Sequence, residues 1–347
     1  GYVAPYAAAL KNRVDKPVFV AGRINQPQIA EEVLSTGQAD VCGMTRAMIC
    51  DPNIGNKART GRTEDIRACI GCNQACIGHF HQGYPISCIQ NPEAGRERLY
   101  AVKTPTKSPK DVMVIGGGPG GMKAAAVAAE RGHNVTLYEK ETQLGGQAKL
   151  AQLLPGRAEF GGIITNLSRE MTLAGVRVIN NTEVTSALVQ EQSPDAIIVA
   201  TGAYPRWPEI EGQEEAHIVD AWQVLNEQAN VGSSVVIADW RSDWIGLGLA
   251  EKLARDGCRV RLYVNANMPG ETIHRYIRDG QMGVINSLGV EVIPMVRLFG
   301  VDDTTAYFQH VTSGEPIIAE DVDTLVLSQG HHSVDSLGVE LESAGFN

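Results

Sequence analysis

The segment DVMVIGGGPGGMKAAAVAAERGHNVTLYEK, residues 111–140, constrains the fold of this chain more than any other stretch. Its pattern predicts a buried strand, a glycine-rich turn, an alanine-rich helix and a second strand. Gly116, Gly118 and Gly121 form G-x-G-x-x-G at the turn, and Glu139 ends the second strand. These glycines permit a tight turn, close approach to a pyrophosphate and close helix–strand packing. Because strand, turn, helix and acidic residue agree, we predict a Rossmann-like unit whose phosphate site and ribose-binding acid hold an ADP-containing ligand, rather than a glycine-rich turn without a ligand.

A degenerate copy of this unit occupies residues 232–264. Aligning Gly257 with Gly132 places Gly246 on Gly121, so the packing glycine is retained. The phosphate-approach glycines and the ribose acid are replaced, by Arg241, Ser242, Asp243 and Val264, with Trp240 and Trp244 alongside. Side chains here obstruct a pyrophosphate, which predicts that the second unit no longer binds a nicotinamide dinucleotide. A divergent NADPH site, with Arg241 on the 2′-phosphate, is the alternative.

The cysteines are unevenly distributed: four of seven lie within residues 69–88, at Cys69, Cys72, Cys76 and Cys88, while Cys42, Cys50 and Cys258 are scattered singly. An odd count without a visible signal peptide predicts reduced thiols rather than a disulfide framework. The C-x2-C-x3-C-x11-C spacing differs from the paired C-x2-C motifs of zinc ribbons. Three close cysteines and one distal cysteine suit the corners of a cubane. We therefore predict a 4Fe–4S cluster, with structural zinc as the alternative.

The residues between these cysteines are expected to support the cluster without binding it. Backbone N–H groups of Asn73, Gln74 and Gly78 are candidates for donating hydrogen bonds to the sulfides. His79 and His81 are expected to be surface or neighbouring residues, because four thiolates already complete the ligand set.

The N-terminal region predicts a β-α-β arrangement. Residues 18–24 predict a buried strand, residues 27–39 a helix, and residues 40–52 a strand followed by a loop and a short helix. This order favours a parallel sheet. Two such units close neither a barrel nor a sheet, so we expect further strands to precede them.

Charge and hydropathy exclude several classes of partner. With 30 Lys and Arg against 40 Asp and Glu, the net charge is −10. This disfavours nucleic acids and anionic membranes, because both present phosphates. No apolar run approaches the roughly 18 residues needed to span a bilayer. We expect a cytoplasmic protein with no nucleic-acid or membrane partner.

Five segments in sequence order, PVFVAGRI, ADVCGMTRAMICDP, IRACIGCNQAC, CIQNPEAGRE and VIGGGPGGMKAA, resemble the family of trimethylamine dehydrogenase and 2,4-dienoyl-CoA reductase. The resemblance implies an α/β fold: the end of an FMN-binding TIM barrel, a 4Fe–4S loop, and a two-part Rossmann-like region that binds FAD, or ADP in its place. We expect the last two barrel units in 1–66, the cluster segment in 67–103, the FAD/ADP-binding domain in 104–231, a degenerate second dinucleotide-binding-like domain in 232–316, and a return to the FAD/ADP-binding domain in 317–347.

The resemblance also implies which residues contact the flavins. Gly22, Arg23, Thr45 and Arg46 match FMN contacts, and loops after the last barrel strands are a common phosphate site. The segments LGGQ and ATGAYP resemble loops beside the flavin of disulfide-reductase-like proteins, which adds the candidates Gly146, Gln147, Ala200, Thr201 and Gly202. Val184, outside these segments, is a further candidate. The family's acid, base and substrate residues lie on earlier barrel strands, so no catalytic residue is named.

Two enzyme classes follow from the resemblance. The first is an amine dehydrogenase or N-demethylase that passes electrons from substrate-reduced FMN through the cluster to an external carrier such as electron-transferring flavoprotein. The second is an NAD(P)H-dependent dienoyl-CoA or enoate reductase, with electrons running the other way. An electron-transfer module alone is a third reading. The altered second unit favours the dehydrogenase, with an N-methylated amine as substrate, and the protein is a possible homo-oligomer.

Overall fold

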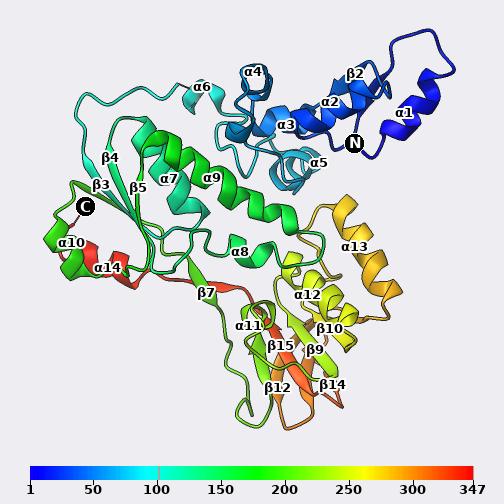
Figure 1. Ribbon diagram of the computed structural model, residues 1–347. Helices are drawn as coiled ribbons and strands as arrows, with labels where there is room; N and C mark the ends of the chain where they lie inside the picture. Colours follow the sequence, from blue (N-terminus) through cyan, green and yellow to red (C-terminus); the bar gives the residue numbers. More distant parts are fainter. Residues whose placement is uncertain (101, 347) are drawn as a thin grey trace.

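The computed structural model describes residues 1–100 and 102–346. Figure 1 shows an N-terminal segment in blue, a first α/β unit mostly in green, and a second α/β unit mostly in yellow, orange and red. Both units contain parallel sheets, which confirms the predicted α/β fold class. Among the described helices, none has the length and apolar character needed to cross a bilayer.

The N-terminal segment contains two short parallel strands, β1 (Phe19–Ala21) and β2 (Val41–Gly43), joined by α2 (Pro27–Ser35). The predicted β-α-β order is confirmed, although β1 is shorter than residues 18–24. Four further helices or helical turns flank it: α1 (Ala4–Lys11), α3 (Thr45–Cys50), α4 (Ile54–Arg59) and η1 (Thr63–Asp65).

The cysteine-rich loop follows, with little regular structure. It contains one π-helical turn, η2 (Gln74–Gly78), the short helix α5 (His79–His81) and, further on, α6 (Glu97–Tyr100). This loop lies against α9 (Gly161–Ala174) of the first unit. Arg67 pairs with Glu170 at 2.6 Å, and Asn166 donates to Gln90 at 2.8 Å. These bonds fix the loop beside the dinucleotide region.

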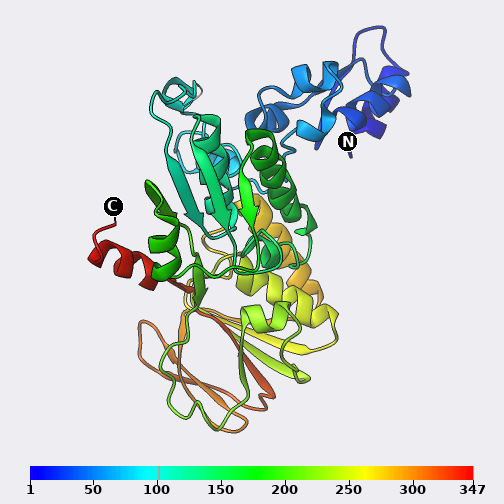
Figure 2. The same cartoon turned by 60° about the vertical axis from the view of Figure 1, so that its left-hand side comes forward.

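The first unit is a four-stranded parallel sheet in the order β5-β4-β3-β6. Its strands are β3 (Asp111–Ile115), β4 (Asn134–Tyr138), β5 (Arg177–Ile179) and β6 (Ala196–Val199). Helices α7 (Pro119–Glu130) and α9 cover one face, while α10 (Ser186–Gln192) and α14 (Ser336–Ser343) lie on the other (Figure 2). Alternate side chains of β3 enter the two cores, with Val114 on one side and Met113 on the other. The sheet is therefore buried on both faces, as its apolar strands require.

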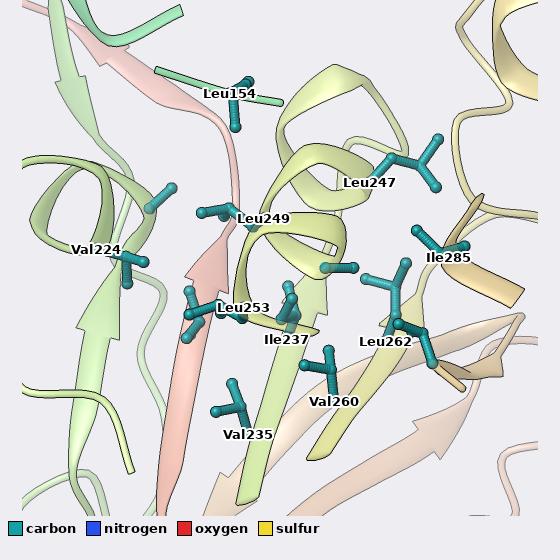
Figure 3. Packing of buried hydrophobic residues seen from close by; sticks show 14 of the residues in the cluster. Leu154, Val224, Val235, Ile237, Leu247, Leu249, Leu253, Val260, Leu262 and Ile285 are labelled. Carbon is teal, nitrogen blue, oxygen red and sulfur yellow. The ribbon is translucent and has the colours of Figure 1, made fainter. Parts of the chain in front are cut away.

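The second unit has a five-stranded parallel sheet in the order β11-β10-β9-β15-β8. Its strands are β8 (Ile218–Asp220), β9 (Ser234–Asp239), β10 (Arg259–Val264), β11 (Glu291–Ile293) and β15 (Thr324–Ser328). Helices α11 (Ala221–Leu225), α12 (Trp244–Arg255) and α13 (Arg275–Ser287) cover one face, and Figure 3 shows Leu247, Leu249 and Ile237 in that core. An antiparallel sheet of β12 (Val296–Val301), β13 (Ala306–His310) and β14 (Pro316–Ala319) covers the other face.

The predicted internal repeat is visible in the paired elements. Helices α7 and α12 have 12 residues each, and Gly121 and Gly246 are the third residue of their helices. Gly132 and Gly257 both follow those helices with positive φ, at 89° and 95°. The alignment made from the sequence is confirmed.

Strand pairing moves two of the expected domain boundaries. Strand β8 precedes residue 232 and β15 follows residue 316, yet both pair in the second sheet. The boundaries at 231/232 and 316/317 therefore cut through this sheet, because the repeat marks only its central β-α-β. Between the units, β7 (Ala203–Pro205) pairs antiparallel with β16 (His331–Ser333). His331 and His332 lie in that strand, and both are exposed.

The remaining elements join the two units. Helix α8 (Ala148–Ala151) and the turn η3 (Ala158–Phe160) connect β4 to α9. Leu154, between them, packs into the core of the second unit (Figure 3).

Candidate cofactor sites

The four clustered cysteines line one small cavity. Cys69, Cys72, Cys76 and Cys88 surround it together with Arg46, and all four are free, partly buried thiols. Cys69 and Cys88, which are 19 positions apart in the sequence, therefore line the same cavity. This is the arrangement expected of a shared set of metal ligands.

A 4Fe–4S cluster and a single zinc ion require different spacings of the ligand sulfurs. Within residues 1–100 and 102–346, no group of three or more His, Cys, Asp and Glu side chains is arranged to hold one metal ion. Tetrahedral zinc needs four ligand sulfurs about 2.3 Å from the same ion. In a cubane, each thiolate binds its own iron, so the sulfurs lie farther apart. The choice between the predicted cluster and structural zinc stays a prediction.

Backbone N–H groups face several of the sulfurs. Burial raises the pKa of Cys72 to about 11, and the hydrogen bond from the Gln74 N–H acts against that rise. Burial likewise raises the pKa of Cys76, opposed by the Ile77 N–H. Gly78 was expected to donate to a sulfide, but its N–H donates to the carbonyl oxygen of Asn73 at 2.8 Å. The π-helical turn uses that donor internally.

Cys50, which appears isolated in the sequence, lies against Cys88. Its side chain is fully buried, and its thiol holds the pKa of Cys88 below the usual range by hydrogen bonding. Gln90 contributes a side-chain N–H to the Cys50 sulfur at 3.4 Å and one to the Ala68 carbonyl at 2.9 Å. No spacing rule would have found this fifth thiol, because it comes from the end of α3.

Several arginines act on the cysteines or their backbone. Arg23 donates to the Cys69 carbonyl oxygen at 2.9 Å and lies 3.8 Å from the Cys69 sulfur. Arg46 lines the cavity, and the charges of Arg46 and Arg67 act to lower the pKa of Cys76 and Cys88. Separate segments of the chain thus supply positive charge to the cysteine loop, although the whole chain is acidic.

The predicted FMN contacts lie at the carboxyl ends of β1 and β2. Gly22 has φ 141°, and a Cβ there would overlap Val3. Thr45 begins α3 and is exposed. The Arg23 side chain turns toward Cys69, and Arg46 hydrogen-bonds the Asn73 side chain. The structure thus brings both arginines to the cysteine cavity, and their contact with FMN remains a prediction.

The glycine-rich turn of the first unit has the shape of a phosphate cradle. A Cβ at Gly116 would overlap the Ala200 carbonyl, and one at Gly121 would overlap the Gly116 carbonyl, so both positions exclude side chains. At Gly118, by contrast, nothing lies within 4 Å of an added Cβ. Gly118 also precedes the first residue of α7, whose free N–H groups favour an anion. The open space lies where the fingerprint requires a pyrophosphate.

Glu139 is buried beside this turn. One carboxylate oxygen accepts the Gly117 N–H at 2.6 Å and the other accepts the Glu141 N–H at 2.9 Å. Each oxygen has a further lone pair, so the carboxylate can still accept ribose hydroxyls. Glu139 therefore shapes the turn in addition to its predicted ligand contact.

The other predicted flavin-loop residues converge on the same edge of the sheet. A Cβ at Gly146 would lie 3.1 Å from the Gly118 Cα, and Gln147 donates to the Ala203 carbonyl at 3.2 Å. Ala200, Thr201 and Gly202 follow β6, and the Thr201 hydroxyl bonds the Val334 carbonyl. Val184 differs, because its side chain lies in the core with Met113 and Tyr138.

The corresponding turn of the second unit is filled by its own side chains. Asp239 accepts the N–H groups of Arg241 at 3.1 Å and Ser242 at 3.0 Å. Asp243 accepts the Ile245 N–H at 2.9 Å and caps α12. Donors that would face a phosphate thus face carboxylates of the chain.

Comparison with known proteins places these sites in a family. Residues 110–346 match the family described as pyridine nucleotide-disulphide oxidoreductase. The chain belongs to that family. In addition, residues 4–65 match the NADH:flavin oxidoreductase / NADH oxidase family. This pairing confirms the resemblance to the family of trimethylamine dehydrogenase and 2,4-dienoyl-CoA reductase, and it supports flavin cofactors.

Individual relatives match different shares of the chain. A metal reductase of Desulforamulus reducens is 40% identical over 74% of this chain and 39% of its own length. A probable N-methylproline demethylase of Rhizobium meliloti is 32% identical over 99% of this chain and 51% of its own length. The chain therefore spans about half or less of these curated relatives. The structure of 6-hydroxypseudooxynicotine amine oxidase from Pseudomonas geniculata N1 is 27% identical, with a TM-score of 0.92 over 99% of this chain and 53% of that one.

Proposed function

We propose that this chain is the cluster-binding and dinucleotide-binding portion of an iron–sulfur flavoprotein amine dehydrogenase or N-demethylase. The observation that carries the proposal is the convergence of four cysteines at one cavity, between the FMN-family segment and the ADP cradle. When bound, flavins supply two-electron oxidation of substrate, and a 4Fe–4S cluster supplies one-electron carriage.

The residues of this chain have separate roles in that arrangement. Cys69, Cys72, Cys76 and Cys88 would hold the cluster. Gly116, Gly118 and Gly121, with Glu139, would hold the ADP portion of FAD or ADP itself. Gly22, Arg23, Thr45 and Arg46 would contribute to an FMN site completed by further barrel strands.

The filled turn of the second unit favours the dehydrogenase. Asp239 and Asp243 occupy the backbone donors that a nicotinamide dinucleotide's pyrophosphate would need. Reducing equivalents would then enter from an oxidisable substrate and leave to an external one-electron carrier, such as an electron-transferring flavoprotein. The demethylase relative that covers nearly the whole chain supports an N-methylated amine as substrate.

The reductase is the second candidate, because a metal reductase is 40% identical over 74% of this chain. In that case NAD(P)H would bind the second unit despite the carboxylates. The two candidates differ in which small molecule delivers electrons.

A stopped-flow experiment separates them. The full-length enzyme is mixed anaerobically with NADH, with NADPH, and with a panel of N-methylated amines. We expect flavin bleaching by an amine and none by either nicotinamide. Rapid bleaching by NADH or NADPH would establish the reductase instead.

A further inference from the structure

A cavity of about 570 Å³ opens on the antiparallel sheet of the second unit. It is lined by residues of β12, β13 and β14 and by part of the segment 206–217, which leads into β8. This sheet lies at the opposite end of the molecule from the N-terminal segment (Figure 1). Pockets of ~300 to ~1,000 Å³ are typical of small-molecule sites. The cavity is separate from the predicted cofactor sites, because none of the residues assigned to those sites lines it.

A β-bulge in β12 creates the hollow. Leu298 pairs with Phe308, and both side chains face the core of the second unit. Gly300 pairs with Tyr307, so Phe299 has no partner on β13. Tyr307 is the neighbour of Phe308 along the strand and therefore faces outward. Because Gly300 has no side chain to set against Tyr307, space stays open beside that ring, and the 59% exposed Phe299 lines the same space.

The segment before β8 forms an acidic wall of this cavity. Glu211 is bridged to Gly300, and its carbonyl oxygen accepts the Val301 N–H at 2.8 Å. Gly212 has φ 78°, and a Cβ there would overlap the Val301 carbonyl oxygen, so this close approach requires glycine. Glu215 closes the turn by donating its N–H to the Gly212 carbonyl at 2.9 Å. Backbone contacts thus hold both glutamates beside the bulge.

The carboxylates of this wall have no basic partner. Within residues 1–100 and 102–346, neither Glu211 nor Glu215 takes part in an ion pair. They are the charged side chains among the residues that line the cavity. The Tyr307 hydroxyl donates to Asp302 at 2.6 Å, which holds its ring in place. The carboxylates attract a cation by charge, and aromatic ring faces attract it by their quadrupole.

One arginine lies on the same face of the sheet without entering the cavity. Arg297 pairs with Gln309 in the ladder and donates to its side-chain oxygen at 3.1 Å. Gln309 lines the cavity, and its side-chain nitrogen donates to the Gly314 carbonyl at 3.1 Å. Both ends of this amide are therefore occupied by the protein, and the two glutamates set the sign of the charge that the cavity presents.

We propose that this cavity binds a small organic cation with an apolar or aromatic body. The positive charge would lie at Glu211 and Glu215, and the body would lie against Phe299 and Tyr307. The site is additional to the proposed cluster, flavin and substrate sites, and it does not depend on them. A neutral molecule of similar shape would lose the attraction of the carboxylates, and an anion would be repelled.

The test is calorimetric titration of full-length enzyme with benzyltrimethylammonium, with benzyl alcohol as the neutral probe and benzenesulfonate as the anionic one. The wild type should bind the cation most tightly and the anion not at all. Glu211→Gln should weaken cation binding roughly two- to fivefold, and the double variant Glu211→Gln/Glu215→Gln about tenfold. Glu214→Gln, which removes an exposed carboxylate of the same segment that does not line the cavity, is the matched control and should leave the affinity unchanged.

The outcomes separate this cavity from the substrate site, which also takes an amine under the proposed function. Cation binding that is unchanged in the double variant would lie elsewhere and would overturn the inference. Equal affinity of the wild type for the cation and for benzyl alcohol would overturn it as well, as would a wild type that binds neither. None of these results bears on the cluster or the flavins, whose contents are measured separately.

Phe299→Ser tests the apolar wall without changing the charge. Because Phe299 is exposed, the variant should fold, and thermal unfolding checks this. We expect cation binding to weaken roughly two- to fivefold. Sedimentation velocity of the same variant tests whether a second copy of the chain covers the cavity. A dimer in the wild type that Phe299→Ser dissociates would assign the cavity to that contact and refute the proposal.

Discussion

Asp239 accepts a hydrogen bond from the backbone N–H of Ser242 at 3.0 Å, inside the turn that corresponds to the glycine-rich turn of the first unit. The acceptor there is an aspartate of the chain, where a dinucleotide-binding unit would present the donor to a ligand phosphate. Three predictions below concern this repeat, and a fourth concerns the cysteines.

We predict that neither NADH nor NADPH binds the second unit. Calorimetric titration of the full-length enzyme should give no binding heat for either, because the turn's donors are occupied and two carboxylates lie near the phosphate position. A positive control is free ADP added to protein stripped of its dinucleotide, which should bind the first unit. Competition between ADP and NADH for one site would contradict the assignment.

We predict a pH-dependent stability difference between wild type and Asp239→Asn. Burial, followed by Asp243, raises the pKa of Asp239 to about 7, and its Oδ2 is buried without a hydrogen-bond partner. An acid whose folded pKa is raised destabilises the fold as pH rises from its unfolded pKa of about 4 to its folded pKa of about 7. The variant should therefore gain roughly 2–4 kcal/mol relative to wild type across that window.

Urea denaturation at pH 4.5 and pH 8 measures this difference. The gain should be small at the lower pH and full at the higher pH. Asp303→Asn, at an exposed aspartate, is the control and should show no such trend. A difference that does not change with pH would contradict the assignment to Asp239.

We predict opposite effects of alanine at two adjacent glycines. Gly121→Ala should destabilise the first unit by about 1–3 kcal/mol, because the added methyl overlaps the Gly116 carbonyl. Gly120→Ala should be neutral or stabilising by up to ~1 kcal/mol, since it lies in α7 with nothing within 4 Å of its Cβ. Thermal unfolding of ligand-stripped protein compares them, and equal losses would refute the packing argument.

We predict that alanine at Cys88 abolishes the cluster, whereas alanine at Cys50 does not. Both thiols lie together, but only Cys88 lines the cavity with Cys69 and Cys72. Anaerobic wild type should contain about four irons and four labile sulfides per chain. Cys88→Ala should lose most of them, and Cys50→Ala should keep them with a changed EPR signal. Zinc without labile sulfide in the wild type would exclude the cluster.

The sequence predicted the parts of these sites that depend on local spacing. The fingerprint, the four cysteines and the alignment of Gly246 with Gly121 each depend on nearby residues, and their positions in the elements follow from helix and strand periods. The sequence did not reveal that Cys50 lies against Cys88 or that Arg67 acts on it. These come from separate segments, and only tertiary packing brings them together.

The expected boundaries at 231/232 and 316/317 differ from the strand pairing for the same reason. Strands β8 and β15 join the second sheet through long-range pairing, although neither belongs to the recognisable repeat. A repeat identifies a β-α-β unit but not the strands added on its edge, because those carry no fingerprint.

The segment from Leu154 to Glu159 has a consequence for domain motion. Leu154 packs against α12, where a Cβ at Gly248 would lie 2.8 Å from its side chain, and Glu159 pairs with Arg23 of the N-terminal segment. Residues 154–159 of the first unit thus contact both the second unit and the N-terminal segment. A hinge rotation of the second unit must therefore either move this segment or break its contacts, so this packing resists independent motion of the second unit.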